Sequence, residues 1–147
     1  MRALIQRVKT ASVSIDGKEV ARIATGFLLL LGVGKDDSAD DAVFLAKKIA
    51  ALRIFQDPDG KMNLNIKDAK GSVLSVPQFT LFADTKKGNR PGFDAAADPQ
   101  TAETLWKECN RLLREERIEV ATGVFGSSMD VALVNDGPVT IWLDSKE

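Results

Sequence analysis

Two stretches, PQFT at 77–80 and NDGPVT at 135–140, carry the residue types and spacings that could do chemistry. In a regular strand, Gln78 and Thr80 point to the same face. A side-chain amide and a hydroxyl that converge beside a strand break at Pro77 could form a small polar site. The same spacing also fits two solvent-facing strand residues, so the pattern alone leaves both interpretations open.

The second stretch centres on Gly137-Pro138, which lies between the apolar alternating stretches MDVALV and TIWLDS. Asn, Asp, Gly and Pro are the usual turn residues, so this pattern favours the turn of a C-terminal β-hairpin. The alternative is that the chain holds this backbone in a special conformation for chemistry.

The absence of histidine narrows the chemistry that these stretches could support. The chain has neither histidine nor tyrosine, which excludes a Ser-His-Asp or Cys-His pair and histidine metal ligands. The single cysteine, Cys109, lies on a helical apolar stripe and fits a buried hydrophobe. Asp57, Asp59, Asn63 and Asn65 lack the EF-hand spacing, so they predict a turn. We therefore expect no metal or cofactor, and an enzyme that uses carboxylates, hydroxyls, amides, lysines, backbone groups or the substrate itself.

Basic residues gather in one polar loop. The net charge is -1, which is not the general basic footprint of a nucleic-acid-binding protein. Lys86, Lys87 and Arg90 nevertheless lie within Asp84 to Phe93, a stretch with three basic residues and one acidic residue. Such a loop fits a solvated segment, and it is also the best patch that this chain offers to a phosphodiester.

Helical spacing appears twice between the predicted strands, which indicates an α/β fold with helices covering one sheet. The first helix is predicted over 38–53, where Ser38 and Asp41 match a capping box. The second begins after Asp98 as N-cap, with Pro99 at the first helical position, and its apolar stripe is Ala102, Leu105, Cys109 and Leu112. Strands are predicted at 3–8, 12–15, 18–23, 26–34, 71–76 (continued by 77–83), 118–126, 129–134 and 139–145.

Length and composition predict one domain spanning 1–147. Of the 147 residues, 44% are hydrophobic and 28% charged, as in ordinary globular proteins. No apolar run approaches the roughly 20 residues of a membrane helix, and the first residues lack a secretory signal pattern. A single cysteine cannot form an internal disulfide, so we expect a cytoplasmic protein that does not enter membranes.

The chain resembles the D-aminoacyl-tRNA deacylases along nearly its whole length. The matching stretches include MRALIQRV, LRIFQDPDGKMNLNI, PQFTLFADTKKGNRPGF and TGVFGSSMDVALVNDGPVT. The family's S-Q-x-T and N-x-G-P-x-T motifs read PQFT and NDGPVT here. The resemblance implies a homodimer with a three-layer α/β/β fold, in which two main helices cover a mixed, mainly antiparallel sheet.

The resemblance also implies the activity and its residues. The family hydrolyses the ester between a D-amino acid, or achiral glycine, and the 3′-terminal adenosine of tRNA, as a proofreading step in translation. Carried over, Gly137 and Pro138 form a cis peptide that enters the partner subunit's active site and rejects L-amino acids. Gln78, Phe79 and Thr80 are the expected catalytic residues. Met129 and Pro77 are expected at the substrate pocket, and Lys86, Lys87 and Arg90 are the expected tRNA contacts.

Pro77 departs from the family pattern, because the S-Q-x-T motif has serine there. A related animal deacylase group has proline at this place, together with a trans Gly-Pro bond and tolerance of some small L-amino acids. Phe79 and the complete N-x-G-P-x-T pattern favour the D-specific group. Relaxed specificity and a non-catalytic, homodimeric RNA-binding module remain the alternatives. For the mechanism, substrate assistance by the ribose 2′-hydroxyl is favoured over a Thr80 nucleophile, since no histidine can activate that hydroxyl.

Overall fold

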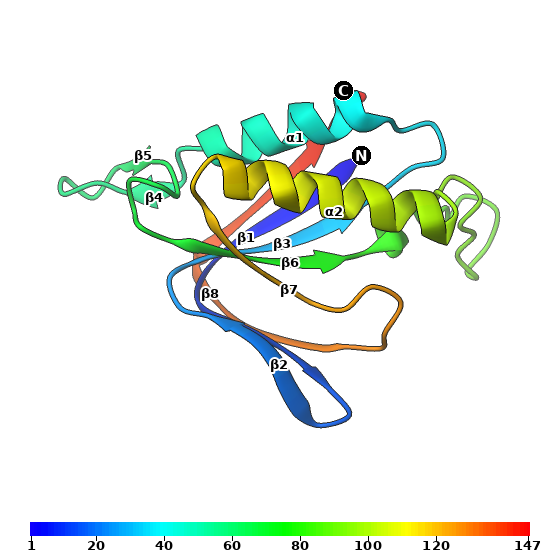
Figure 1. The fold of residues 1–147 in the computed structure, drawn as a ribbon, viewed down its shortest axis with the longest axis horizontal. Helices are drawn as coiled ribbons and strands as arrows, with labels where there is room; N and C mark the ends of the chain where they lie inside the picture. The colour runs from blue at the N-terminus through cyan, green and yellow to red at the C-terminus, as the bar shows by residue number, and fades with distance from the viewer.

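A mixed β-sheet covered on one face by two helices organises the chain in the computed structural model, which describes residues 1–147 (Figure 1). The elements are β1 (Arg2–Ile15), β2 (Lys18–Ile23), β3 (Gly26–Gly32), α1 (Ala39–Ala51), β4 (Phe55–Gln56), β5 (Met62–Leu64), β6 (Ser72–Pro77), η1 (Phe79–Phe82), α2 (Pro99–Glu115), β7 (Glu119–Thr122) and β8 (Asp130–Asp144). Neither helix is long and apolar enough to cross a membrane.

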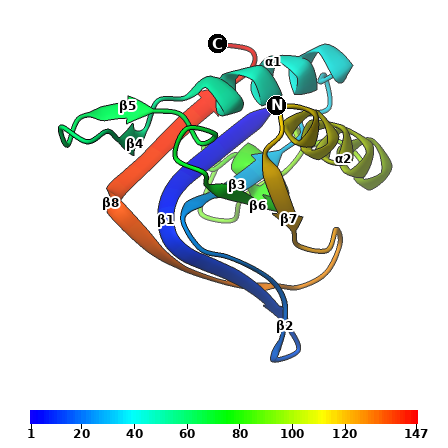
Figure 2. The same ribbon diagram turned by 60° about the vertical axis from the view of Figure 1, so that its left-hand side comes forward.

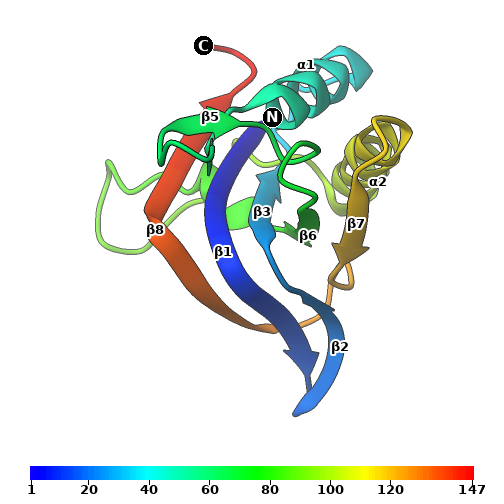
Figure 3. The same ribbon diagram turned by 90° about the vertical axis from the view of Figure 1, so that its left-hand side faces the viewer.

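The main sheet has the order β2-β1-β3-β6-β7, and β8 also pairs with β1. Strand β1 is antiparallel to β2, β3 and β8, whereas β3, β6 and β7 are parallel. Figures 2 and 3 show that the long strands β1 and β8 bend, so that their far ends and β2 fold back beneath the rest of the sheet. The α/β fold with two helices over a mixed, mainly antiparallel sheet is therefore confirmed.

Two hydrophobic clusters lie on the two sides of this sheet. The larger one packs α1 and α2 against the sheet and includes Phe27, Leu29 and Leu45. The smaller one lies within the curl of the sheet and includes Leu28 and Leu74. Because neighbouring strand residues point to opposite faces, Leu28 and Leu29 enter different clusters. This explains why β3 is a continuous apolar run, buried on both faces as the sequence predicts.

Both helices begin where the sequence predicts. The Asp98 carboxylate accepts the Thr101 N–H at 3.0 Å, with Pro99 at the start of α2. At the start of α1, the Asp41 carboxylate accepts the Ser38 N–H at 2.8 Å. Three residues of the predicted stripe of α2, Ala102, Leu105 and Cys109, are buried, and Leu112 is partly buried against the same cluster. Leu113, which the predicted stripe omitted, is fully buried.

Three of the strand predictions are wrong. Stretches 3–8 and 12–15 form the single strand β1, because its middle residues also pair with β8. The turn predicted around Asp57 is present, since the Gly60 N–H donates to the Asp57 carbonyl at 2.9 Å, and it joins the small antiparallel hairpin of β4 and β5, which the sequence did not predict. Segment 77–83 does not continue β6, and segments 129–134 and 139–145 do not form a hairpin; both of these differences shape the site described below.

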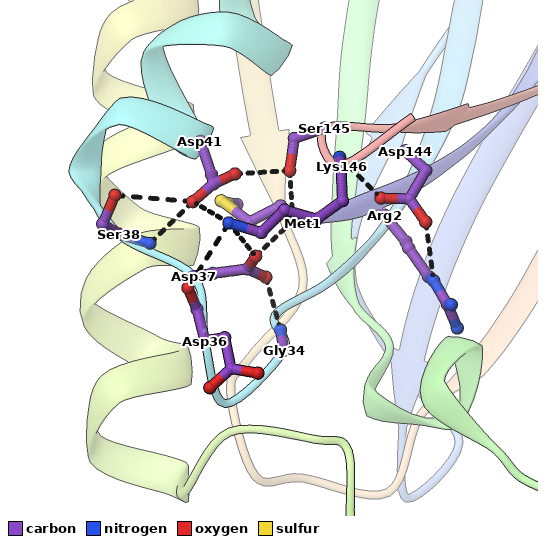
Figure 4. Close-up of polar contacts among 10 residues, drawn as sticks. All are labelled: Met1, Arg2, Gly34, Asp36, Asp37, Ser38, Asp41, Asp144, Ser145 and Lys146. Atoms are coloured by element: carbon purple, nitrogen blue, oxygen red, sulfur yellow. Dashed lines mark hydrogen bonds and ion pairs between the residues drawn. The ribbon is translucent and has the colours of Figure 1, made fainter.

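Both chain ends meet at the start of α1 (Figure 4). The Met1 α-ammonium lies 2.7 Å from an Asp37 carboxylate oxygen and donates to Ser145 Oγ at 2.5 Å. Ser145 Oγ in turn donates to Asp41 at 2.6 Å, and Lys146 Nζ lies 3.1 Å from the same carboxylate. These contacts fix the ends of β1 and β8 relative to the helical layer.

This network also sets the ionisation of Asp41. Burial by itself would raise the pKa of this carboxyl group, but hydrogen bonds from Ser145, the Ser38 N–H and Lys146, together with the nearby α-ammonium, outweigh that effect. They lower the pKa of Asp41 to about 2. The carboxylate is therefore a stabilising anion of the folded state at neutral pH.

Candidate active site

The candidate site is a cavity of about 590 Å³ between the first half of α2, the ends of β3 and β6, and the segment that enters β8. Twelve of its seventeen lining residues are hydrophobic, which suits a mostly apolar ligand held by a few polar groups. The lining residues are Leu31, Val33, Val76, Pro77, Gln78, Phe79, Phe93, Ala96, Ala97, Pro99, Ala102, Trp106, Phe125, Gly126, Ser127, Met129 and Val131.

The rim of the cavity is a 3-10 helix, η1, where the sequence predicts a strand. Pro77 ends β6 because its ring nitrogen cannot donate to a sheet ladder, and the backbone then turns at Gln78. The Gln78 N–H is anchored on the Leu31 carbonyl at 2.8 Å. A Cβ on Gly32 would lie only 2.9 Å from the Gln78 carbonyl oxygen, so glycine at this position allows η1 to pack directly on β3.

The predicted pair of Gln78 and Thr80 is brought together by this turn rather than by strand alternation. The Gln78 side-chain amide donates to Thr80 Oγ1. Phe79 is 56% exposed, and its ring meets the edge of the Phe93 ring at 5.0 Å between centroids. Of the three residues, Gln78 and Phe79 line the cavity and Thr80 stands next to them.

Met129 lies on the opposite wall, just before β8. Its sulfur occupies the space beside Gly123, where an added Cβ would lie 2.6 Å from Met129 Sδ. Pro77 and Met129 therefore belong to one cavity with Gln78 and Phe79. The structure thus gathers these four candidate residues from segments about fifty positions apart.

The inner wall of the cavity includes a residue that the sequence did not single out. Trp106 of α2 is 4% exposed and donates its indole N–H to the buried Ser75 hydroxyl at 2.9 Å. Phe125 packs beside it, with 6.0 Å between the ring centroids. Trp106 is four residues after Ala102, so the helical period could have indicated that both face the same way.

Gly137 and Pro138 do not line the cavity of their own chain. They are exposed and lie within β8, so the predicted hairpin is wrong: β8 is one strand of 15 residues. It pairs with β1 on both sides of a bulge, because Gln6 opposes Thr140 while Val8 opposes Asn135. The longer stretch of β8 bulges outward there, and the Gly137-Pro138 peptide bond is cis.

Two side chains hold the bulge: Asn135, the first residue of the NDGPVT motif, and Arg7, which the sequence did not single out. The Asn135 amide closes a ring with Val139, accepting its N–H at 2.8 Å and donating to its carbonyl at 3.1 Å. Arg7 is 4% exposed and donates to the Asp136 carbonyl at 2.8 Å and to the Ile54 carbonyl at 2.5 Å. Arg7 shares a strand face with the apolar Ala3 and Ile5, and that alternation was the available signal.

Lys86, Lys87 and Arg90 lie in an exposed loop that is closed by paired backbone bonds between Asp84 and Gly92, at 2.8 and 2.9 Å. None of the three basic residues takes part in an ion pair. The loop leads directly to Phe93 on the cavity wall. The cationic loop is thus adjacent in the chain to the site.

Cys109 lies outside the cavity and is not a candidate nucleophile. Burial, followed by the nearby Glu108 carboxylate, raises the pKa of its thiol to about 12. A thiol of that pKa is protonated at neutral pH and unreactive. Cys109 is a core residue of α2, as the helical stripe predicts.

The chain matches one family of known proteins along nearly its whole length. Residues 4–144 match the family model described as D-Tyr-tRNA(Tyr) deacylase. The chain is 54% identical over 147 residues to a D-aminoacyl-tRNA deacylase of Thermus aquaticus, covering all of this chain and 97% of that protein. A solved structure named c-Myc DNA Unwinding Element Binding Protein superposes with a TM-score of 0.92 at 36% identity, covering 98% of both chains. A probable eukaryotic D-amino acid tRNA deacylase, at 16% identity, shares the fold with a TM-score of 0.79 over 97% of both chains.

Proposed function

This chain belongs to the D-aminoacyl-tRNA deacylase family and is a carboxylic ester hydrolase, and from that premise we propose how its residues perform the reaction. The cavity beside η1 receives the aminoacyl ester and the terminal adenosine of tRNA, and the exposed Gly137-Pro138 bulge of the partner subunit completes the site. The observation that carries this proposal is the separation of the two motifs. One lines an open cavity, and the other projects from the same chain outside it.

The bulge is suited to recognition through its backbone. The Asp136 carbonyl accepts a hydrogen bond from Arg7, and the Val139 carbonyl accepts one from Asn135. The Gly137 and Pro138 carbonyls, which lie between them in the chain, are available as acceptors. Carbonyl oxygens pair well with an ammonium group. The absence of a Cβ at Gly137 lets a ligand approach the backbone closely. We assign these two carbonyls to the α-ammonium of the substrate.

Chiral selection follows from that contact. Once the ammonium and the ester are both fixed, the two remaining substituents of the α-carbon have fixed directions. A D side chain points to open space, whereas an L side chain meets the backbone of the bulge. Rejection by a built-in clash does not depend on the identity of the side chain. The site therefore accepts many D-amino acids, and it accepts glycine, which includes glycine mischarged on tRNA-Ala.

The chemical step uses backbone groups and the substrate's own hydroxyl. Phe79 and Thr80 begin η1, so their N–H groups have no acceptor within that helix and are the candidate oxyanion donors. The aminoacyl ester is activated and carries a neighbouring 2′-hydroxyl that can assist a water molecule. Precise placement then supplies much of the rate. A Thr80 nucleophile is disfavoured because Gln78 donates to its oxygen and no base accepts its proton.

The cationic loop would contact the phosphates nearest the tRNA terminus. Lys86, Lys87 and Arg90 are free of ion pairs and precede Phe93 of the cavity wall in the chain. A near-neutral net charge predicts that binding is concentrated at the end of the tRNA rather than spread over its body. We place this reaction in the cytoplasm, as a step of translation quality control.

Subunit mixing tests whether the bulge acts on the partner. Ala96→Trp fills the cavity of its own chain, and Gly137→Ala disturbs the bulge. Each variant alone should cleave D-aminoacyl-tRNA at least about tenfold more slowly than the wild type. After subunit exchange, the mixture should regain about a quarter of wild-type activity, because half of the dimers are mixed and each has one intact site. If the bulge served its own chain, every site would carry a defect and the mixture would be no more active than the two variants measured separately.

Three measurements separate the remaining alternatives. Cleavage of the ester by purified, metal-chelated protein excludes a non-catalytic RNA-binding module. Thr80→Ala should retain turnover close to the wild-type rate, and a large loss would restore the nucleophile hypothesis. Substrate ending in 2′-deoxyadenosine should be cleaved slowly, and cleavage at the full rate would refute substrate assistance.

A further inference from the structure

Arg2 joins the rim of the cavity to the end of β8. Its Nη1 donates to the Leu81 carbonyl of η1 at 2.9 Å. Its Nε donates to Asp144 Oδ2 at 3.1 Å, a contact that Figure 4 shows. The Asp144 side chain is only 7% exposed, and the Arg2 side chain is 33% exposed. As the first residue of β1, Arg2 lies between Gly32 of β3 and Asp144 of β8 in the sheet register.

Two aromatic rings flank the same guanidinium. Arg2 Cζ lies 4.4 Å from the centroid of the Phe82 ring of η1 and 5.6 Å from that of Trp142 of β8. A cation over an aromatic face is attracted by the ring quadrupole. A planar guanidinium can stack on a ring while its N–H groups donate within the plane. Arg2 therefore contacts η1 through both a hydrogen bond and a ring.

η1 also rests on two glycines at and just after the end of β3. An added Cβ on Gly32 would lie 3.2 Å from Leu81 Cβ, and one on Gly34 would lie 2.8 Å from Phe82 Cε1. These contacts stop η1 from moving toward β3. The Arg2 bond to Leu81 is the one side-chain hydrogen bond that η1 receives from another helix or strand, and it ties η1 to β1, the strand beside β3.

We propose that Arg2 is a positioning residue for the deacylation reaction. It holds η1 against the glycines, so that the Phe79 and Thr80 N–H groups keep their direction toward the ester. Arg2 itself is not catalytic, because its partners Leu81 and Phe82 do not line the cavity. The positioning role of Arg2 rests on the proposed role of η1 in stabilising the oxyanion. The contacts between Arg2 and η1 are independent of that proposal.

The test compares Arg2→Met with Arg2→Lys and with the control Arg22→Met. Arg22 forms an exposed pair with Glu19 on β2, which pairs with residues 11–15 at the opposite end of β1 from Arg2. Arg2→Met should lower kcat for D-aminoacyl-tRNA by about tenfold to a hundredfold, with KM changed less than about twofold, because misplaced groups lose transition-state contacts rather than ground-state binding. Arg2→Lys keeps one charged donor and should recover part of kcat. Arg22→Met should match the wild type, and mass spectrometry checks that Met1 remains on each variant.

Amide hydrogen exchange gives a readout that does not require activity. In Arg2→Met, amides of residues 79–83 should exchange faster, while those of β3 and β6 stay as protected as in the wild type. Unchanged kcat with unchanged exchange in η1 would overturn the proposal. Faster exchange throughout the sheet, with equal losses in Arg2→Met and Arg2→Lys, would also overturn it, because Arg2 would then be a general stabilising residue. A wild-type protein that fails to cleave the ester would refute the proposed function, and the exchange comparison would still decide whether Arg2 holds η1.

Discussion

Substituting Gly137 by alanine tests whether the bulge of β8 has the shape described above. Gly137 has a φ of +144°, a backbone conformation that L side chains rarely adopt. An added Cβ would lie 2.7 Å from Val139 Cγ2, 2.9 Å from Val139 N and 3.3 Å from Arg7 Nη2. Val139 is 8% exposed, and its N–H is held by Asn135, so the alanine side chain must displace the bulge itself.

The structure offers a matched control for the backbone contribution. Gly88 has a φ of +145°, and a Cβ there meets nothing within 4 Å. Gly88→Ala should therefore lower the free energy of unfolding by about 1 kcal/mol through the backbone alone. Gly137→Ala adds a steric cost of about 1–3 kcal/mol, for a total of about 2–4 kcal/mol. With a slope near 2 kcal/mol per molar urea, its midpoint should fall by roughly 1–2 M.

The same change should impair the reaction while the protein remains folded. A total stability of about 5–15 kcal/mol tolerates the loss at 25 °C, so activity can be measured on native Gly137→Ala. Displacement of the two carbonyls should lower D-aminoacyl-tRNA cleavage by about tenfold or more. A urea midpoint equal to that of Gly88→Ala would refute the steric argument. A wild-type cleavage rate would refute the assignment of the bulge to the site.

Three further predictions concern the scaffold. The pKa of Asp41 is lowered to about 2 in the folded state, so the ionised carboxylate stabilises the fold by about 2 kcal/mol above about pH 4, and this stabilisation is lost as the pH falls toward 2. Over that pH range, the urea midpoint of Asp41→Asn should fall less than that of the wild type. Parallel curves of midpoint against pH would contradict this. The Cys109 thiol, whose pKa is raised to about 12, should not react with a disulfide reagent at pH 8 until urea unfolds the chain, and rapid reaction of the native protein would contradict its burial. Trp106→Phe removes the bond to the buried Ser75 hydroxyl and should lower the free energy of unfolding by about 1–3 kcal/mol in urea titrations, whereas an unchanged midpoint would show that the hydroxyl finds another partner.

Local signals in the sequence were enough to predict the helices and the central strand. The Asp98 cap with Pro99 and the apolar run of β3 depend only on neighbouring residues, and both are confirmed. The strand β8 could not be predicted in the same way. Its turn residues describe a hairpin locally, but pairing of both halves with β1 keeps them in one strand and turns Gly137-Pro138 into a bulge.

The candidate site was predictable in its parts but not in its assembly. Motif resemblance identified Gln78, Phe79 and Met129, which line one cavity. The 3-10 helix that carries Phe79 depends on Gly32, which is distant in sequence and has no side chain to give a signal. Trp106 on α2 contributes through tertiary packing, and Arg7 holds the bulge through two backbone carbonyls. Contacts of this kind appear only once the strands and helices are placed in space.

The site is proposed to hydrolyse aminoacyl-tRNA esters and to select them by the chirality of the amino acid. One comparison tests this most directly. Purified protein is incubated with the same tRNA carrying either D-alanine or L-alanine, and the rate of ester hydrolysis is measured for both. We predict that the D ester is cleaved faster by about a hundredfold or more. This comparison also addresses Pro77, the departure from the family motif. Cleavage of L-alanyl-tRNA at an equal or higher rate would contradict the account.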